Sequence, residues 1–242
     1  MQSDPNVPAT LVAHLDRLAA QRADDTALIV VDAAGDTRYD YAALHDRVTA
    51  LASHLATLAM PGERAMLLLD SGIDYVTAFF GCLYAGLIAV PAFEPGAVRS
   101  AQVARLQAIA IDAGPALMLT TGAQAATHAE ALALIAPSAR VVPVDASHAP
   151  AAPDWRPFAP QPDTLAFLQY TSGSTASPKG VMVSHGNVLA NEVAIAAGMG
   201  IGPADVIATW LPLYHDMGLI GGLLQPIYTG VPVVMMSPQF FL

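Results

Sequence analysis

Apolar residues recur at helical spacing in some segments of the chain and form short continuous runs in others. Leu11, Leu15 and Leu18 recur as one face of a helix, directly after Thr10, a residue type that caps helices. Short apolar runs between turn residues indicate buried strands. We expect helices at 42–58, 73–86, 99–112 and 123–135, strands at 27–31, 66–69, 87–90, 116–120 and 140–144, and a hairpin arm at 37–41.

The alternation of strands and helices predicts the fold class. It is typical of βαβ units, so we expect an α/β fold with doubly wound, mainly parallel sheets in two stacked subdomains, the second incomplete. Five prolines crowd the segment from Ala146 to Pro162 and exclude a regular helix there. We therefore expect an N-terminal α/β subdomain at 1–145, a Pro-rich connection at 146–163 and a second, truncated α/β subdomain at 164–242.

The second subdomain continues the same alternation. Strands are expected at 164–169, 181–183, 206–210 and 231–235. A helix running to about residue 197 is expected to start with Ser184 or Asn187 as its cap.

Composition narrows the classes of function. Hydrophobic residues make up 54% of the 242 residues, which is ample for a buried core, and the net charge of −10 argues against nucleic-acid binding. Cys82 is the only cysteine, and the N-terminus lacks a secretory signal pattern, so a cytoplasmic location is expected. The apolar stretches 76–92 and 217–236 are interrupted by glycine and proline, which favours core packing over a membrane span.

The segment from Tyr170 to Gly180 carries the clearest chemical signal. It reads YTSGSTASPKG, so hydroxyl residues surround Gly173, and Lys179, the only lysine of the chain, lies near its end. Loops of this composition can direct N–H groups and hydroxyls at phosphate oxygens. It is not a P-loop of the Gly-Lys-Ser/Thr type, because Gly180 follows the lysine, which disfavours a kinase. From the residues alone, a hairpin turn without a ligand remains an equal alternative.

A second informative segment, WLPLYHDMGLIG, covers Trp210 to Gly221. His215 and Asp216 lie where a loop meets a helix, and helix N-termini favour anions. From the residues alone, a histidine that only caps its own helix is the better interpretation. A zinc site is disfavoured, because no second ligand follows at helical spacing and Cys82 is remote.

The two segments together resemble motifs of the acyl-adenylating, or AMP-binding, superfamily. Tyr170 to Asn187 is similar to its phosphate-binding loop, and Leu211 to Ile220 is similar to the second core motif of its fatty-acyl-AMP ligase branch. Weaker support comes from Ala89 to Phe93 and from the pair Arg105-Leu106. The amino-acid-activating branch usually has Phe-Asp in the second motif. The departure here implies a carboxylic acid without an amine, most simply a fatty acid.

The resemblance implies a reaction and its participants. Fatty acid and ATP would give acyl-AMP and pyrophosphate, with Mg²⁺ as the metal and an acyl carrier protein or coenzyme A as the acceptor, in polyketide or lipopeptide biosynthesis. His215 is the implied catalytic residue, facing the α-phosphate and the carboxylate. Thr171 is the implied metal-side ligand. The implied phosphate-binding residues are Thr171, Ser172, Gly173, Ser174, Thr175, Lys179 and Gly180.

The superfamily's later motifs, including the lid domain with its catalytic lysine, are not found in this sequence. The chain therefore resembles an N-terminal portion of such a ligase and is expected to be inactive alone. Two alternatives stay open. One is a fragment of a long-chain acyl-CoA ligase, and the other is a non-catalytic chain that binds nucleotide or a partner protein.

Overall fold

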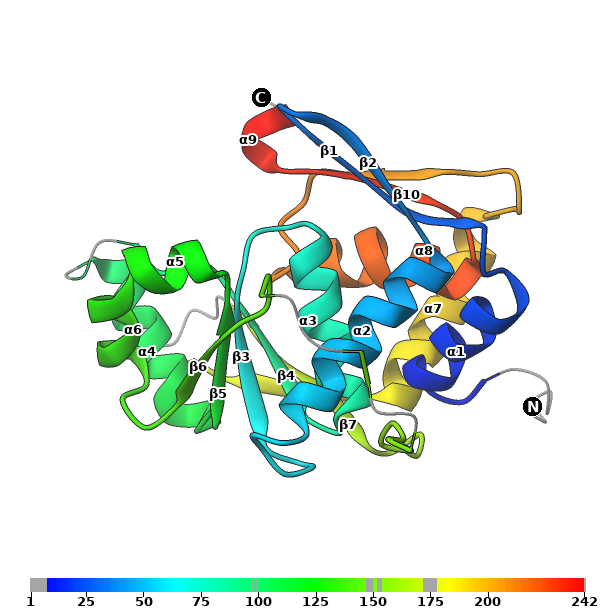
Figure 1. Ribbon diagram of the computed structural model, residues 1–242. Helices are drawn as coiled ribbons and strands as arrows, with labels where there is room; N and C mark the ends of the chain where they lie inside the picture. Colours follow the sequence, from blue (N-terminus) through cyan, green and yellow to red (C-terminus); the bar gives the residue numbers. More distant parts are fainter. Residues whose placement is uncertain are drawn as a thin grey trace.

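The computed structural model describes residues 8–96, 98, 100–146, 150–151, 154–171 and 178–241. These residues form an α/β fold with two sheets, and helices lie between the sheets and outside the larger one (Figure 1). The predicted α/β class with mainly parallel sheets is confirmed. Among the described residues, no helix has both the length and the apolar character that crossing a bilayer requires.

The larger sheet has six strands in the order β6-β5-β3-β4-β7-β8. All neighbours are parallel except β7 and β8, which form an antiparallel hairpin at one edge. The strands are β3 (Arg64–Leu68), β4 (Ile88–Ala92), β5 (Leu117–Thr120), β6 (Arg140–Pro143), β7 (Leu165–Tyr170) and β8 (Gly180–Ser184).

The smaller sheet joins segments from opposite ends of the sequence. Its order is β2-β1-β10-β9, where β1 and β2 form the predicted hairpin and β10 lies parallel to both β1 and β9. The strands are β1 (Thr26–Asp32), β2 (Gly35–Asp40), β9 (Ile207–Thr209) and β10 (Val233–Met236).

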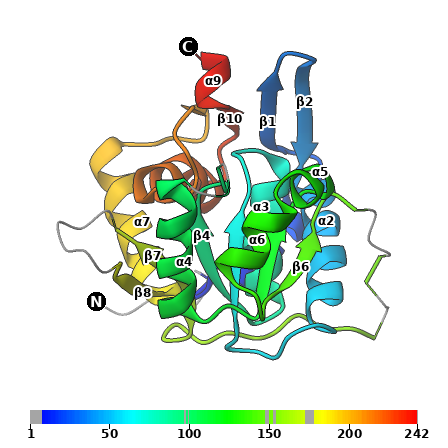
Figure 2. The same cartoon turned by 90° about the vertical axis from the view of Figure 1, so that its left-hand side faces the viewer.

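The helices cover both faces of the larger sheet. Helices α4, α5 and α6 lie on one face, and α2 and α3 lie on the other (Figure 2). The second helical layer also contains α1, α7 and α8 and is covered by the smaller sheet (Figure 1). The helices are α1 (Leu11–Gln21), α2 (Tyr41–Leu55), α3 (Ile73–Tyr84), α4 (Ala101–Ala113), α5 (Gly122–Thr127), α6 (Ala129–Ile135), α7 (His185–Met199), the π-helix η1 (Met217–Leu224), α8 (Gln225–Thr229) and α9 (Pro238–Phe241).

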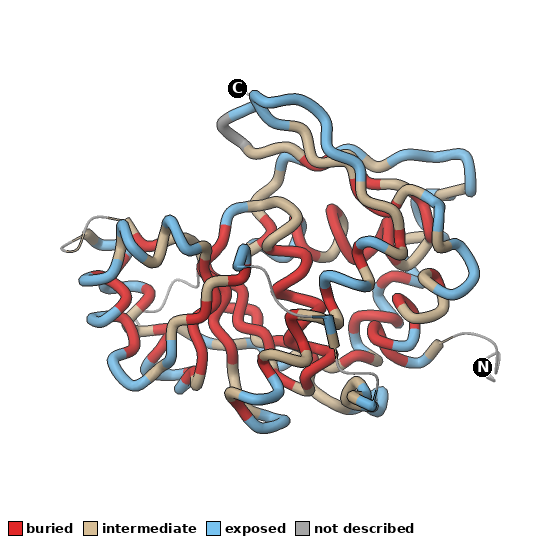
Figure 3. The backbone as a smooth tube through the Cα atoms, viewed as in Figure 1, coloured by how far each residue is buried: buried red, intermediate tan, exposed pale blue. Residues whose placement is uncertain are grey.

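Strand β3 contributes side chains to two hydrophobic cores, one on each face of the larger sheet. Ala65 and Leu67 pack with the helical layer between the sheets, whereas Met66 and Leu68 pack against α4 and α6. Successive side chains of a strand point to opposite faces, so a continuous apolar run is what a sheet covered on both sides requires. The buried backbone in Figure 3 follows these central strands and the helices between the sheets.

The helix starts follow the capping residues of the sequence. The Thr10 hydroxyl accepts a hydrogen bond from the Ala13 amide at 3.2 Å. Of the two caps considered for α7, Ser184 is the N-cap and Asn187 completes a reciprocal capping box. The helix expected at 123–135 is divided into α5 and α6 at His128.

Each sheet combines strands from before and after the Pro-rich connection. Strands β7 and β8, from beyond the Pro-rich connection, complete the sheet formed by β3 to β6, while β1 and β2 pair with β10 and β9. The connection itself has neither helix nor strand in its described residues, 146, 150–151 and 154–163. The subdomains at 1–145 and 164–242 stay a prediction.

Candidate functional site

The loop with the strongest sequence signal begins where β7 ends. Tyr170 pairs with Gly180 across the β7–β8 hairpin, so the two ends of the loop lie side by side. Thr171 and Lys179, which follow and precede these residues inside the loop, have exposed side chains. The predicted phosphate-binding residues Ser172, Gly173, Ser174 and Thr175 lie outside the described residues.

The base of the loop is fixed by the side chain of Tyr170. Its hydroxyl donates a hydrogen bond to Asp112 Oδ2 of α4 at 2.5 Å. Burial, together with the bond to the Asp112 carboxylate, raises the pKa of the Tyr170 phenol well above its ordinary value. The ring fills the space above Gly180, where a Cβ atom would come within 2.9 Å of it. A glycine is needed here because the ring occupies the place of a side chain.

The segment that carries His215 lies beside this strand end and is tied to three other elements. The amide of Leu213 donates to Ser71 Oγ at 3.1 Å, and the Leu213 carbonyl accepts from the Tyr75 hydroxyl at 2.9 Å. The next carbonyl, of Tyr214, accepts from Gln169 Nε2 at 2.9 Å. The backbone on the N-terminal side of His215 is therefore fixed by side chains from β7, α3 and the β3–α3 connection.

The cap of the following helix is Asp216 and not His215. Asp216 Oδ1 accepts from the Met217 amide at 2.7 Å at the start of η1. The side-chain cap of this helix is therefore Asp216, and the role of His215 stays a prediction. The imidazole is exposed and packs at 4.7 Å between ring centroids against Tyr214.

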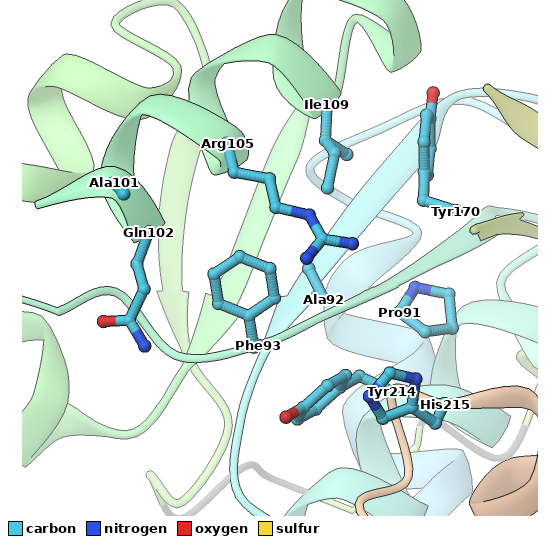
Figure 4. A pocket seen from close by; sticks show the side chains of 10 residues that line it. All are labelled: Pro91, Ala92, Phe93, Ala101, Gln102, Arg105, Ile109, Tyr170, Tyr214 and His215. Atoms are coloured by element: carbon cyan, nitrogen blue, oxygen red, sulfur yellow. The ribbon is translucent and has the colours of Figure 1, made fainter. Parts of the chain in front are cut away.

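Two adjoining cavities meet at His215 and Tyr170. The larger, of about 310 Å³, lies between α4, the end of β4 and the His215 segment, and Figure 4 shows its lining side chains. Arg105 extends into it from α4, with its guanidinium carbon 5.5 Å from the centre of the Phe93 ring. The smaller cavity, of about 90 Å³, is lined by Gln169, Tyr170, Thr171, His215 and Asp216.

The structure thus brings together two of the predicted site residues. Thr171 and His215, from separate segments of the second half of the chain, line the same small cavity. Gly180 lies at the base of the loop, and Lys179 lines neither of these two cavities. The roles of Thr171, Lys179, Gly180 and His215 stay predictions.

Sequence reasoning missed the residues that hold the site in place. These residues act on the site only through contacts between segments that are distant in the sequence; they are Gln169, Asp112 and Tyr214. One signal was present, because Gln169 is a polar residue at the end of an otherwise apolar strand and is only 7% exposed. A buried polar side chain needs a partner, so it marks a tertiary contact.

A third cavity, of about 200 Å³, adjoins the first one at Phe93, Gln102 and Tyr214 and contains two acidic residues, Asp70 and Glu94. Partial burial and the neighbouring Asp70 carboxylate raise the pKa of Glu94 to about 7. This cavity is therefore acidic, in contrast to the Arg105 cavity beside it.

The sequence matches known proteins over most of its length. The pattern of the AMP-binding enzyme family matches residues 15–241. A medium-chain-fatty-acid–[acyl-carrier-protein] ligase, JamA of Moorena producens, is 38% identical over 83% of this chain. A long-chain-fatty-acid–AMP ligase, FadD32 of Mycolicibacterium smegmatis, is 36% identical over 96% of it.

Solved structures show the same fold. The fatty acid AMP ligase of Legionella pneumophila superposes with a TM-score of 0.89 at 32% identity and covers 97% of this chain. A fatty acyl-adenylate ligase of the same organism, solved with acyl adenylate and pyrophosphate, gives a TM-score of 0.84 at 33% identity over 96% of this chain.

The match covers only a part of each relative. This chain spans 35% of the JamA ligase, 38% of the FadD32 ligase and 40% of each of the two Legionella chains. Within that part, the family pattern includes β7, the loop that follows it and the His215 segment. On this evidence the chain belongs to the AMP-binding enzyme family.

Proposed function

We propose that this chain supplies one wall of the active site of a fatty acid adenylating enzyme. The reaction would join a fatty acid to ATP and give acyl-AMP and pyrophosphate. The observation that carries the proposal is the convergence of Thr171, at the start of the loop, and His215 on one cavity. The printed activities of the relatives, fatty-acid–AMP and fatty-acid–carrier-protein ligation, support the substrate class.

The chemistry requires control of negative charge. A carboxylate oxygen attacks the α-phosphorus, an acyl–phosphate bond forms, and the bond from the α-phosphorus to the bridging oxygen breaks as pyrophosphate leaves. Two anions must approach each other, and fixed donors and cations lower that barrier. Lys179 would supply a positive charge beside the phosphates, and the His215 imidazole would donate a hydrogen bond to the reacting oxygens.

A magnesium ion fits the donor atoms of the small cavity. Thr171 and Asp216 both bear oxygen atoms, which are the ligands that Mg²⁺ prefers, and the cavity contains no thiol. Magnesium at nucleotide sites is held largely by the phosphates, with few protein ligands. Thr171 would hold the ion at the start of the loop, and the ion would offset charge on the phosphates.

The acceptor of the acyl group is proposed to be the thiol of an acyl carrier protein. The JamA relative is named as a carrier-protein ligase, which favours this acceptor over coenzyme A. The expected cytoplasmic location also remains a proposal and rests on the single, buried Cys82.

Pyrophosphate exchange tests this function in the full-length protein. Exchange of labelled pyrophosphate into ATP should depend on a fatty acid and should not occur with an amino acid. Lys179→Ala and His215→Ala should each lower exchange by about 10²–10³-fold, the range for loss of one charge-stabilising group. Arg140→Ala removes an exposed cation on β6, away from both cavities, and should leave the rate unchanged.

Two results would decide against the proposal. Absence of fatty-acid-dependent exchange in the wild-type protein would exclude adenylation, and unchanged kinetics in Lys179→Ala would remove that residue from the site. A separate assay with holo carrier protein and with coenzyme A identifies the acceptor from the thioester that forms.

A further inference from the structure

Gln169 is the last residue of β7 before Tyr170 and lies between the two predicted motifs. Its Nε2 donates to the Tyr214 carbonyl at 2.9 Å, across a sequence separation of 45 residues. It also lines the small cavity together with Thr171 and His215. One side chain therefore joins the strand that leads into the loop to the backbone directly before His215.

Only one of the two polar atoms of the Gln169 amide has a partner among the described residues. Its Oε1 is shielded from solvent and has no hydrogen-bond partner among the described residues. An apolar side chain of the same size would avoid this unpartnered acceptor, but it would also remove the donor to the Tyr214 carbonyl. The amide is therefore better explained by the position that its donor gives to the Tyr214 carbonyl.

The neighbouring residue fixes the same strand end from the opposite side. Successive side chains of a strand point to opposite faces. Gln169 reaches the His215 segment on one face, and Tyr170 reaches Asp112 of α4 on the other face. The residue that follows is Thr171, so its position relative to His215 depends on both contacts.

We propose that Gln169 is a positioning residue, which sets the separation of His215 from Thr171 through the Tyr214 carbonyl. The consequence for catalysis rests on the proposed function above. The consequence for the His215 ring does not, because it concerns the protein without substrate. Loss of the amide donor frees the Tyr214 carbonyl and allows the His215 segment to move away from the loop.

The first test observes His215 directly and needs no activity. The side chain is followed by NMR in protein labelled at its histidines, and its signal is assigned with His215→Gln. Gln169→Met keeps the size of the side chain and removes the donor, so the His215 signal should shift. Gln161→Met changes an exposed glutamine on the connection before β7 and should leave the His215 signal unchanged.

The second test measures kinetics and uses pH to restore the donor. Gln169→Met should lower kcat for pyrophosphate exchange by about tenfold or more, because a misplaced group acts mainly in the transition state. KM for ATP should change by less than threefold. Gln169→Glu retains the shape and can donate only when its carboxyl is protonated, so its rate relative to wild type should rise as pH falls.

The outcomes separate this proposal from the proposed function. An unshifted His215 signal in Gln169→Met overturns the positioning role, whatever the activity. The positioning role is also overturned if Gln169→Glu loses the same fraction of the exchange rate at every pH. A variant whose melting temperature changes while its exchange rate does not would overturn it as well. A shifted signal in a wild-type background that shows no exchange leaves the positioning role standing and rejects adenylation instead.

Discussion

At the scale of single residues, Tyr170 has three functions in the structure. It ends a buried strand, its ring occupies the space above Gly180, and its hydroxyl reaches Asp112. A sequence pattern shows only the first, because the other two depend on which segments become neighbours. The candidate site is held by such contacts, and sequence reasoning proposed ligand-binding residues but not the residues that hold the site in place.

Replacement of Tyr170 by phenylalanine tests the hydroxyl contact. The ring is buried, and its hydrogen bond to an exposed carboxylate should contribute about 1–2 kcal/mol to the free energy of unfolding. For a chain of this size the melting temperature should fall by about 2–6 °C. The matched control is Tyr39→Phe, at a half-buried tyrosine of β2, which should change the melting temperature by less than about 1 °C. Equal shifts in the two variants would contradict the assignment.

At the scale of elements, most helices and strands follow from apolar spacing and capping residues, to within a few positions. The exceptions have physical causes. The pattern at 123–135 is a continuous helical one, yet α5 ends and α6 begins at His128. The π-helix η1 was not expected, since its apolar, glycine-rich sequence is also compatible with an α-helix. Hydrogen-bond spacing within a helix leaves no clear mark in apolar periodicity.

Two glycines that look alike in the sequence should respond in opposite ways to alanine. At Gly180 a Cβ would meet the Tyr170 ring, which is held by Asp112, so Gly180→Ala should destabilise the protein by about 1–3 kcal/mol. At Gly198, inside α7, a Cβ would meet nothing within 4 Å. Gly198→Ala should therefore stabilise the protein by about 0.5–1 kcal/mol.

Urea unfolding of the two variants measures both changes in one experiment. Midpoints should move in opposite directions with equal slopes. If Gly180→Ala is neutral, the Tyr170 ring is free to move and the loop base is not fixed as described.

At the scale of the whole molecule, buried ionisable groups lie where α1, α7 and α8 meet. His14 Nε2 donates to the Tyr228 carbonyl at 2.8 Å, and His185 Nδ1 accepts from the Leu11 amide at 3.1 Å. Burial lowers the pKa of each imidazole to about 4, aided at His14 by Arg17. Burial also raises the pKa of Glu192 to about 8.

Within this group of three residues, the combined contribution to stability is largest near pH 6.5. Between about pH 4 and 6.5, His14 and His185 are protonated in the unfolded chain but neutral in the folded protein. Stability is therefore lost as pH falls through this range. Between pH 4.5 and 8, folded Glu192 keeps a proton that the unfolded chain releases, so its contribution is lost as pH rises. Each effect amounts to a few kcal/mol at most, at about 1.4 kcal/mol per pKa unit.

The variant Glu192→Gln isolates the alkaline side of this profile. Urea unfolding between pH 6.5 and 8.5 should show a smaller loss of stability than wild type, because the side chain can no longer ionise. Glu130→Gln changes an exposed carboxylate on α6 and should leave the wild-type slope intact. Identical slopes in Glu192→Gln and wild type would show that Glu192 does not cause the decline.

The arrangement of the sheets is the part of the fold that could not be predicted from local sequence patterns. The βαβ pattern indicates parallel strands near one another, and β3 to β6 fulfil it. It does not indicate that β1 pairs with β10, or that β7 joins β4. These pairings depend on the burial of the whole helical layer between the sheets, in which Leu28 and Val233 share one core.

The parallel pairing of β1 with β10 also affects how the protein is made. On the ribosome, the β1–β2 hairpin emerges early, but its inner edge has no partner until β10 has been synthesised. Until then the nascent chain carries an open strand edge beside apolar helices, which is the kind of surface that chaperones shield. Slow synthesis or a late pause should therefore favour aggregation, and chaperone dependence during expression should exceed that expected for a domain built from neighbouring segments.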